Sequence, residues 1–329
     1  MYRTAESVSP KHPDKVCDRI SDAILDECLR QDPYSRVAIE TMGGHGIITV
    51  TGELTTKAYI NVRDIVTRIA GDKYGVQTNI VKQSLDIAQG VDIGGAGDQG
   101  IMIGYACRDN EEMMPQEYYL ARDLCKYLYE RYEEDGKTQI TLNDDGKIID
   151  IVVSFNNVKK GDLWSITQDW LGLKLHQMED EKCNFHINSA GDWSVGSFDA
   201  DAGLTGRKIV CDAYGPNVPV GGGAFSGKDP SKVDRSGAYY ARSIAVGLLK
   251  QNKNFDNITV KLAFAIGIKE PVDFSYTAYQ IEQKSMVEIN LEKDTVTVKK
   301  MIEELDLKSP FYEQTAEWGA FGNKFNWDK

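Results

Sequence analysis

The chain has 329 residues, 41% of them hydrophobic and 27% charged, with a formal net charge of −12. This length predicts two or three domains with sizeable cores; the negative charge argues against a nucleic acid partner, and the absence of long apolar runs against a secretory signal or a membrane span. The six cysteines form no CxxC pair and the four histidines are scattered, so we expect no zinc site and a reduced, cytoplasmic protein.

The first third of the chain predicts a helix, a hairpin and a second helix. Apolar residues recur at helical spacing over 15–29, and Asp32-Pro33 ends that helix. The runs 36–41 and 47–55 are typical of strands, and the glycines between them indicate a hairpin turn. The segment 61–75 again places its apolar residues on one helical face.

The same order returns in the middle of the chain. Strand-like runs at 138–142 and 147–155 flank Asp145-Gly146, which is a strong type I′ hairpin sequence. The segment 162–173 follows with helical spacing. The middle third therefore repeats the hairpin-then-helix pattern of the first.

A third copy consists of strands at 257–268 and 273–281 and a helix at 297–307. The copies follow one another at roughly 100–120 residues, which is too long for a solenoid repeat. We therefore predict an α+β fold of three similar units around a pseudo-threefold axis, each an antiparallel sheet with helices on one face. The expected units are 1–94, 95–196 and 197–329.

A glycine-rich stretch at 89–100, QGVDIGGAGDQG, lacks any periodicity and is predicted to be the most flexible part of the chain. Because residues 83–97 contain few apolar anchors, little burial would offset the entropy lost on ordering them. We expect this segment to act as an active-site lid. The alternative is a plain surface connection.

Residues 221–234, GGGAFSGKDPSKVD, form the most distinctive stretch, which we call the glycine-lysine loop. Its glycines permit close approach of a ligand to the backbone, and Lys228 and Lys232 suit phosphate oxygens. Part of it matches the GxxxxGK of a P-loop, but Asp229 stands where that motif needs serine or threonine. An acid there would face phosphates, so we expect no true P-loop. The alternative is a mobile surface loop with solvated lysines.

Two further segments carry charges suited to an anion. Arg207 and Lys208 end GLTGRK and enter the strand-like KIVCDAY, where both reach one ligand only near a strand end; an exposed basic strand end is the alternative. His12 and Asp14 stand at the start of the first helix, which favours anions. Asp14 is either the helix N-cap or a ligand of a divalent cation, with His12 on a phosphate oxygen.

Two acids belong to the first hairpin. Glu40 is expected on the strand face opposite Val37, Ile39 and Thr41. Glu53 is expected to follow the second strand after a glycine. Each is either an exposed strand acid or a ligand for a cation or an ammonium group.

Together these segments resemble the methionine adenosyltransferase (S-adenosylmethionine synthetase) family. HPDKV, GAGDQG, GLTGRK, GGGAFSGKDPSKVDRS and YEQTAEWGAFG occur in that family's order, and the resemblance runs from about residue 6 to 327. It implies synthesis of S-adenosylmethionine from ATP and methionine, with displaced triphosphate hydrolysed to pyrophosphate and phosphate. It also implies a homodimer or homotetramer whose active site lies between subunits, with no nucleic acid or membrane partner.

The resemblance implies individual roles as well. The residues expected to act on the triphosphate are His12, Lys137, Arg207, Lys208, Lys228 and Lys232. Further contacts to ATP are expected from Asp135, Gly136, Trp193, Asp201, Ala224 and Ile266. Methionine is expected to contact Glu53, Gln83, Asp98, Asp201 and Lys232. Asp14 and Asp234 would hold Mg²⁺, and Glu40 would hold K⁺.

The chain departs from the family pattern at several positions. Asp192-Trp193 stands where the family has a basic residue and phenylalanine, Leu85 replaces a proline, and the loop before GAGDQG is shortened. These changes put lid behaviour and turnover in doubt more than the type of reaction. The alternatives are another ATP-dependent transferase or kinase, and a non-catalytic regulatory subunit; the retained basic and acidic residues argue against the latter.

Overall fold

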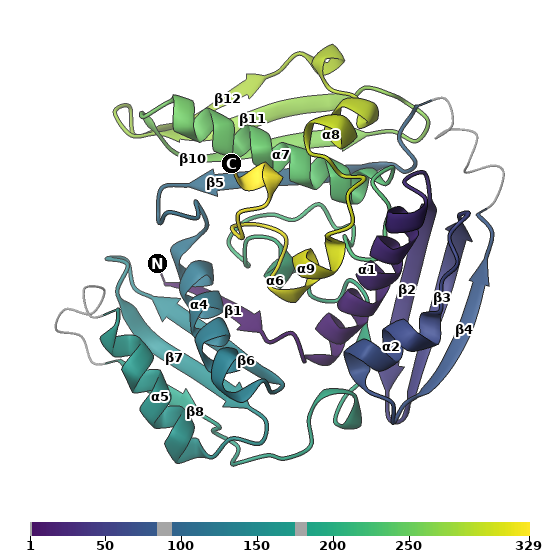
Figure 1. Cartoon of the computed structure of the whole chain (residues 1–329). Helices are drawn as coiled ribbons and strands as arrows, with labels where there is room; N and C mark the ends of the chain where they lie inside the picture. Colours follow the sequence, from purple (N-terminus) through teal and green to yellow (C-terminus); the bar gives the residue numbers. More distant parts are fainter. Residues whose placement is uncertain (1, 84–93, 175–182) are drawn as a thin grey trace.

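Three four-stranded sheets surround the middle of the molecule in the computed structural model, which describes residues 2–83, 94–174 and 183–329 (Figure 1). One long helix lies against each sheet, and the short helices α6 (Ile209–Asp212) and α9 (Tyr312–Glu317) lie near the centre. The predicted α+β fold of three similar units is confirmed.

Each sheet is built on one of the predicted hairpins. The first has the order β4-β3-β2-β9, the second β8-β7-β6-β1 and the third β12-β11-β10-β5. Ten of these twelve strands are β1 (Arg3–Val8), β2 (Arg36–Gly44), β3 (Ile47–Thr55), β4 (Gly75–Val81), β5 (Gly100–Cys107), β6 (Gly136–Leu142), β7 (Ile148–Phe155), β8 (Asn184–Ile187), β9 (Gly203–Leu204) and β10 (Phe255–Phe264). The other two are β11 (Asp273–Gln280) and β12 (Ser285–Asn290). Pairing is antiparallel except for β3 with β4 and β7 with β8, which are parallel.

The fourth strand of every sheet comes from another third of the chain. Strand β1 joins the central sheet beside β6, β5 joins the last sheet beside β10, and β9 joins the first sheet beside β2. Strands β1 and β5 lead directly into long helices, whereas β9 is followed first by the short helix α6. The exchanged strands link the three thirds in a ring (Figure 1). The sheets therefore cross the expected unit boundaries, which remain predictions.

The helices follow the same threefold plan. The three long ones are α1 (Pro13–Gln31), α4 (Gln116–Tyr132) and α7 (Val233–Gln251). Shorter helices are α2 (Val62–Ala70), α5 (Lys160–Gly172) and α8 (Val298–Glu304). The predicted helices at 15–29, 61–75, 162–173 and 297–307 are confirmed, with ends shifted by a few residues. Helix α7 was not predicted, although leucines and alanines at helical spacing mark it.

Two local predictions were wrong. The strand-like KIVCDAY contains the short helix α6, because Asp212 and Ala213 donate their backbone N–H groups to the carbonyls of Lys208 and Ile209. Glu53 lies within β3, as the strand-like run 47–55 indicated, and the expectation that it follows the strand was wrong. The expected face of Glu40 is confirmed, since it is exposed while its neighbours on the strand alternate with it.

Helix α1 occupies the most buried position of the long helices. Fifteen of its residues are buried, among them the acids Asp18 and Asp22. Asp22 pairs at 2.6 Å with Arg235 of α7, so the first and last thirds share a charged contact inside one hydrophobic core. A second core belongs to the central sheet with α4 and α5.

Cys17, Cys28 and Cys125 are unpaired and lie buried in the hydrophobic cores, where they act as small apolar side chains. Among the described helices, none is long and apolar enough to cross a membrane. Most of the predicted lid, residues 84–93 with Leu85, lies outside the described residues.

Candidate active site

The N-terminus of α1 is closed by His12. Its Nδ1 accepts the backbone N–H of Asp14 at 3.2 Å, so His12 is the N-cap and the alternative of Asp14 as cap is wrong. Burial, followed by the charge of Lys208, lowers the pKa of His12 to about 3. The ring is therefore neutral at physiological pH, with its proton on Nε2, where it can be donated.

Asp14 is paired with the basic end of GLTGRK. Its Oδ2 accepts a 2.6 Å hydrogen bond from Lys208 Nζ, and its Oδ1 accepts the backbone N–H of Leu204 at 2.9 Å. Arg207 Nε lies 3.8 Å from Oδ1. Burial raises the pKa of Asp14, but the hydrogen bonds from Lys208 and Leu204 outweigh it and hold the pKa below its usual value.

Two glycines allow GLTGRK, residues 203–208, to pack closely against Pro13 and Ala224. A Cβ on Gly203 would lie 2.3 Å from the carbonyl of Pro13, and one on Gly206 would lie 2.4 Å from Ala224 Cβ. Gly206 also has a φ of +78° and donates its N–H to Asp18 Oδ1 at 2.8 Å. The segment thus lies between the start of α1 and the glycine-lysine loop, and brings their charges together.

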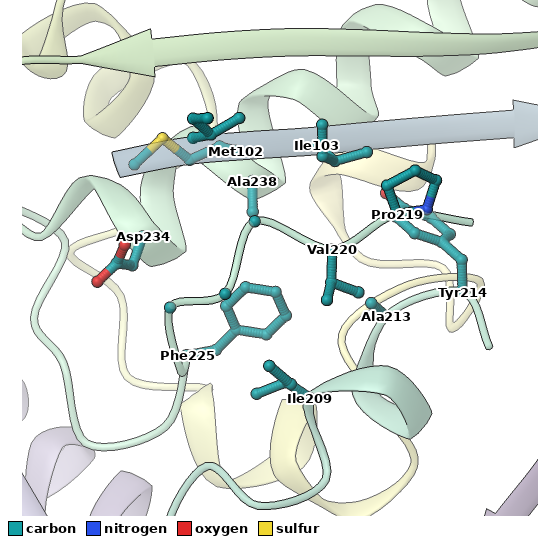
Figure 2. A pocket seen from close by; sticks show the side chains of 14 residues that line it. Met102, Ile103, Ile209, Ala213, Tyr214, Pro219, Val220, Phe225, Asp234 and Ala238 are labelled. Carbon is teal, nitrogen blue, oxygen red and sulfur yellow. The ribbon is translucent and has the colours of Figure 1, made fainter. Parts of the chain in front are cut away.

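A second lysine–aspartate pair stands at the start of α7, where Lys228 Nζ donates to Asp234 Oδ2 at 2.6 Å. A Cβ on Gly223 would lie 2.2 Å from Asp234 Cγ, so glycine is needed for the loop to cross the carboxylate. Figure 2 shows Asp234 at one end of a small hollow beside Phe225. Its volume of about 20 Å³ admits little more than one water molecule.

The glycine-lysine loop is anchored to β2 and is not a solvated surface loop. Ile39 N donates to Gly227 O at 3.0 Å, and Asp229 N donates to Val37 O at 3.0 Å. Buried Asp229 also accepts Lys232 Nζ at 2.7 Å, so that ammonium is already engaged. Since α7 begins only at Val233, the geometry differs from a P-loop.

The open face of the first sheet carries the predicted methionine and potassium residues. The backbone of Lys228 forms an isolated antiparallel β-bridge with Ala38 in β2, and Ala38 lies opposite Glu53 in β3. Residues directly opposite share a face, and so does Glu40, two residues further along β2. Gln83 follows β4, with its N–H 3.3 Å from Thr55 Oγ1 at the same end of the sheet.

Asp98 and Ile266 lie on two segments that pair with each other. Ala96 N donates to Ile268 O, and Gly267 N donates to Ala96 O, both at 2.8 Å. Asp98 is two residues from Gly100, where a Cβ would lie 3.2 Å from Asp234 Oδ1. The fold thus joins these two predicted residues to the start of α7.

The central unit supplies a third group. Ser9 N donates to Gly136 O at 2.9 Å, which ties the residues before His12 to the start of β6. Lys137 is exposed next in β6, and its charge contributes to the lowered pKa of His12. Asp135 accepts Ser197 N at 2.7 Å, and burial raises its pKa to about 6.

Two predicted contacts lack a direct link to these pairs among the described residues. Trp193 lies against the central sheet, where its carbonyl accepts Asn157 N at 2.9 Å. Exposed Asp201 accepts only the N–H of Ala202, at 2.8 Å. Asp192 accepts Lys160 N at 2.8 Å, so this acid stabilises the start of α5.

Buried charges behind the site were missed from the sequence. Lys15 pairs with Asp18 at 3.1 Å and with Asp212, and Arg235 pairs with Asp22. Each cation directly follows a predicted magnesium ligand in its helix, and that pattern could have identified them. Within the described ranges, no group of three His, Cys, Asp or Glu side chains could hold a metal by itself.

Comparison with known proteins gives matches along the chain. Models of the N-terminal, central and C-terminal domains of S-adenosylmethionine synthetase match residues 1–88, 93–193 and 195–329. An S-adenosylmethionine synthase from Sulfurimonas denitrificans is 39% identical over 99% of this chain and 93% of the relative. One from Brachyspira hyodysenteriae is 38% identical over 100% and 95%, and one from Clostridium tetani is 40% identical over 97% and 93%.

Proposed function

The chain belongs to the S-adenosylmethionine synthetase family, and from this premise we propose that it is a methionine adenosyltransferase whose two lysine–aspartate pairs receive the triphosphate of ATP. The methionine sulfur displaces triphosphate from C5′, and the triphosphate is hydrolysed to pyrophosphate and phosphate. The observation that carries the site is the convergence of two basic loops on the starts of α1 and α7.

The residue types suit this reaction. A thioether is a nucleophile without a proton to remove, so the protein needs no base to activate it. The barrier comes from negative charge that grows on the leaving triphosphate. Each preorganised donor that stabilises this charge raises the rate by about 10²–10³. Lys208, Lys228, Arg207 and Lys137 supply positive charge, and His12 donates its Nε2–H.

Magnesium fits the donor set. Mg²⁺ is held in proteins by one or two carboxylates together with phosphate oxygens and water, and Asp14 and Asp234 are single carboxylates at separate helix starts. When bound, Mg²⁺ would neutralise charge on the phosphates. We propose that Lys208 and Lys228 then leave these carboxylates and bind phosphate oxygens. In the free protein each lysine is thus a placeholder: it occupies the position that Mg²⁺ would take. Glu40, exposed near Lys228, would hold K⁺.

Methionine is proposed to bind at the open face of the first sheet of a second copy, with Glu53 and Gln83. Apolar side chains are exposed on this face: Met42 is 51% exposed and Ile47 is 47% exposed. Since no described residue of the same chain covers them, a partner subunit accounts for both the apolar face and the open site. The proposed roles of Asp98, Asp201 and Lys232 toward the substrates remain expectations.

A matched pair of variants tests the assembly. Met42→Asp places a charge on the proposed interface and should give a monomer with strongly reduced activity in sedimentation and assay. Tyr59→Asp changes a side chain that is 81% exposed outside that face, and should leave the oligomer and activity unchanged. A fully active monomer would rule out the shared site.

Mass spectrometry after incubation with ATP, methionine, Mg²⁺ and K⁺ tests the function. We expect a product with the mass of S-adenosylmethionine, and γ-phosphate label recovered as inorganic phosphate. Label transferred to an organic product would instead indicate a kinase, and no turnover by the intact assembly would indicate a regulatory subunit. A cytoplasmic location is part of the proposal, supported by the unpaired cysteines.

A further inference from the structure

Lys126 is a half-buried amine outside the proposed active site. It lies on α4, and its Nζ donates to Asn323 Oδ1 at 2.8 Å and sits 5.7 Å from the ring centroid of Trp318. Asn323 is held in this orientation because its Nδ2 donates to three carbonyls of the C-terminal segment, including that of Gly319 at 2.9 Å. The amine therefore has a fixed, uncharged partner.

No acid neutralises this ammonium at close range: among the described residues, Lys126 forms no salt bridge. Asp123, one turn earlier, is engaged by Lys174 at 2.9 Å and by Trp170 Nε1 at 2.7 Å. The buried guanidinium of Arg122 lies on the same face of α4, held by the carbonyls of the C-terminal segment and by Glu112. A second positive charge there costs free energy.

These surroundings favour the neutral amine. Burial lowers the pKa of Lys126 most and Arg122 lowers it further, while Glu112, Asp123 and Glu130 act in the opposite direction, giving a pKa of about 8. At pH 7 about one amine in ten is then unprotonated, against about one in 2,500 for an ordinary lysine. Only the unprotonated amine is a nucleophile.

Lys126 also borders open space. It lines an open hollow of about 530 Å³ together with Tyr129, Glu130, Glu133 and Trp318. The indole offers an apolar surface for a small alkyl group. The two glutamates disfavour an anionic product such as a carbamate, because like charges in contact repel; a neutral amide meets no such penalty.

We propose that Lys126 is a site of Nε-acylation by small activated acyl donors. The Nε lone pair attacks the acyl carbon, the N–C bond forms, and the bond from that carbon to phosphate or thiolate breaks; the departing proton goes to solvent. The amide product keeps one N–H for Asn323, places its alkyl group over Trp318, and removes the charge beside Arg122.

The intact assembly is treated briefly with an acyl donor, and peptide mapping then locates the modified lysines. One arm uses acetyl phosphate, and the other uses the neutral thioester S-acetyl-N-acetylcysteamine. Lys299, whose side chain is 79% exposed beside Glu303, is the internal reference. We expect Lys126 to be acylated at least tenfold faster than Lys299 at pH 7 by one or both donors. The donor that works identifies the source.

The pH profile and two variants sharpen the test. The acylation rate of Lys126 should level off above pH 8, whereas a lysine with the ordinary pKa of about 10.4 would still gain rate at pH 9. Lys126→Arg should lose the labelled peptide and keep the methionine- and ATP-dependent activity unchanged. Trp318→Ala should slow labelling, because solvent then surrounds the amine and favours its protonated form. The proposal is overturned if Lys126 reacts no faster than Lys299 with both donors, whatever the outcome for the proposed function.

Discussion

The starts of α7 and α4 share one plan but present different chemistry. Each helix has an acid at its second position, Asp234 in α7 and Glu117 in α4, where unpaired N–H groups and the helix dipole favour negative charge. Helix α1 repeats the plan with Asp14. The fold therefore places an equivalent carboxylate three times.

The difference lies in what reaches each acid. Asp234 is met by Lys228 from a glycine-rich loop. Glu117, 1% exposed, is met by Arg3 at 3.3 Å and by Asn217 Nδ2 at 2.7 Å. Among the described residues, no glycine approaches the carboxylate of Glu117 as Gly223 approaches that of Asp234. The two acids thus differ in the kind of partner: a lysine from a glycine-rich loop approaches Asp234, whereas Arg3 and Asn217 enclose Glu117.

Metal dependence should separate the helix starts most sharply. We expect EDTA to abolish activity and Mg²⁺ to restore it, and Asp234→Asn or Asp14→Asn to raise the Mg²⁺ concentration for half-maximal activity at least tenfold, because carboxylate ligands are lost. Glu117→Gln should leave that concentration unchanged.

Electron paramagnetic resonance of bound Mn²⁺ tests the placeholder role of the lysines. Because Lys208 and Lys228 occupy Asp14 and Asp234 in the free protein, Mn²⁺ should bind weakly without ATP and more tightly with it. Equally tight binding without ATP would contradict the placeholder role.

Substitution of the residue directly after each acid should affect stability differently in α7 and α4. Arg235→Met leaves Asp22 as an unpaired buried charge and should lower the free energy of unfolding by about 3–5 kcal/mol. The equivalent residue of α4 is Tyr118, whose hydroxyl donates to the carbonyl of Cys211, so Tyr118→Phe should cost only about 1 kcal/mol. Denaturant titration measures both, and equal losses would refute the distinction.

The basic partners should differ in their effect on catalysis. Lys228→Ala and His12→Ala should each lower kcat at least about tenfold, because each removes a contact that strengthens in the transition state. Arg3→Ala, which removes the partner of Glu117, should leave kcat unchanged, since Arg3 is 39% exposed and contacts neither loop. Steady-state kinetics decide; wild-type kcat in Lys228→Ala would remove this lysine from the site.

The smallest expected effect concerns potassium. Glu40 is exposed on the open face of β2 and belongs to neither helix start. If it holds K⁺, Glu40→Ala should lose the stimulation by K⁺ and keep the basal activity with Mg²⁺. A K⁺ titration of both proteins checks this, and identical responses would exclude Glu40 as the ligand.

Local patterns predicted much of the frame. Asp145-Gly146 and Gly46 encode turns. Alternation along β2 placed Glu40 on the open face, because side-chain direction in a strand depends only on spacing. The motif order also predicted the family. The short helix at 209–212 was missed because β-branched residues suit strands when their tertiary surroundings are unknown.

The amino-acid pattern alone was enough to predict the repeated hairpin units, the start of α1 and the set of charged residues proposed to act on ATP. The strands that complete each sheet, and the charges that meet, could be identified only in the folded chain. Lys208 and Asp14 are 194 residues apart in the chain, and nothing local to either selects the other. Their contact follows from the exchange of β1, β5 and β9 between sheets, which is set by free strand edges and buried faces brought together only on folding.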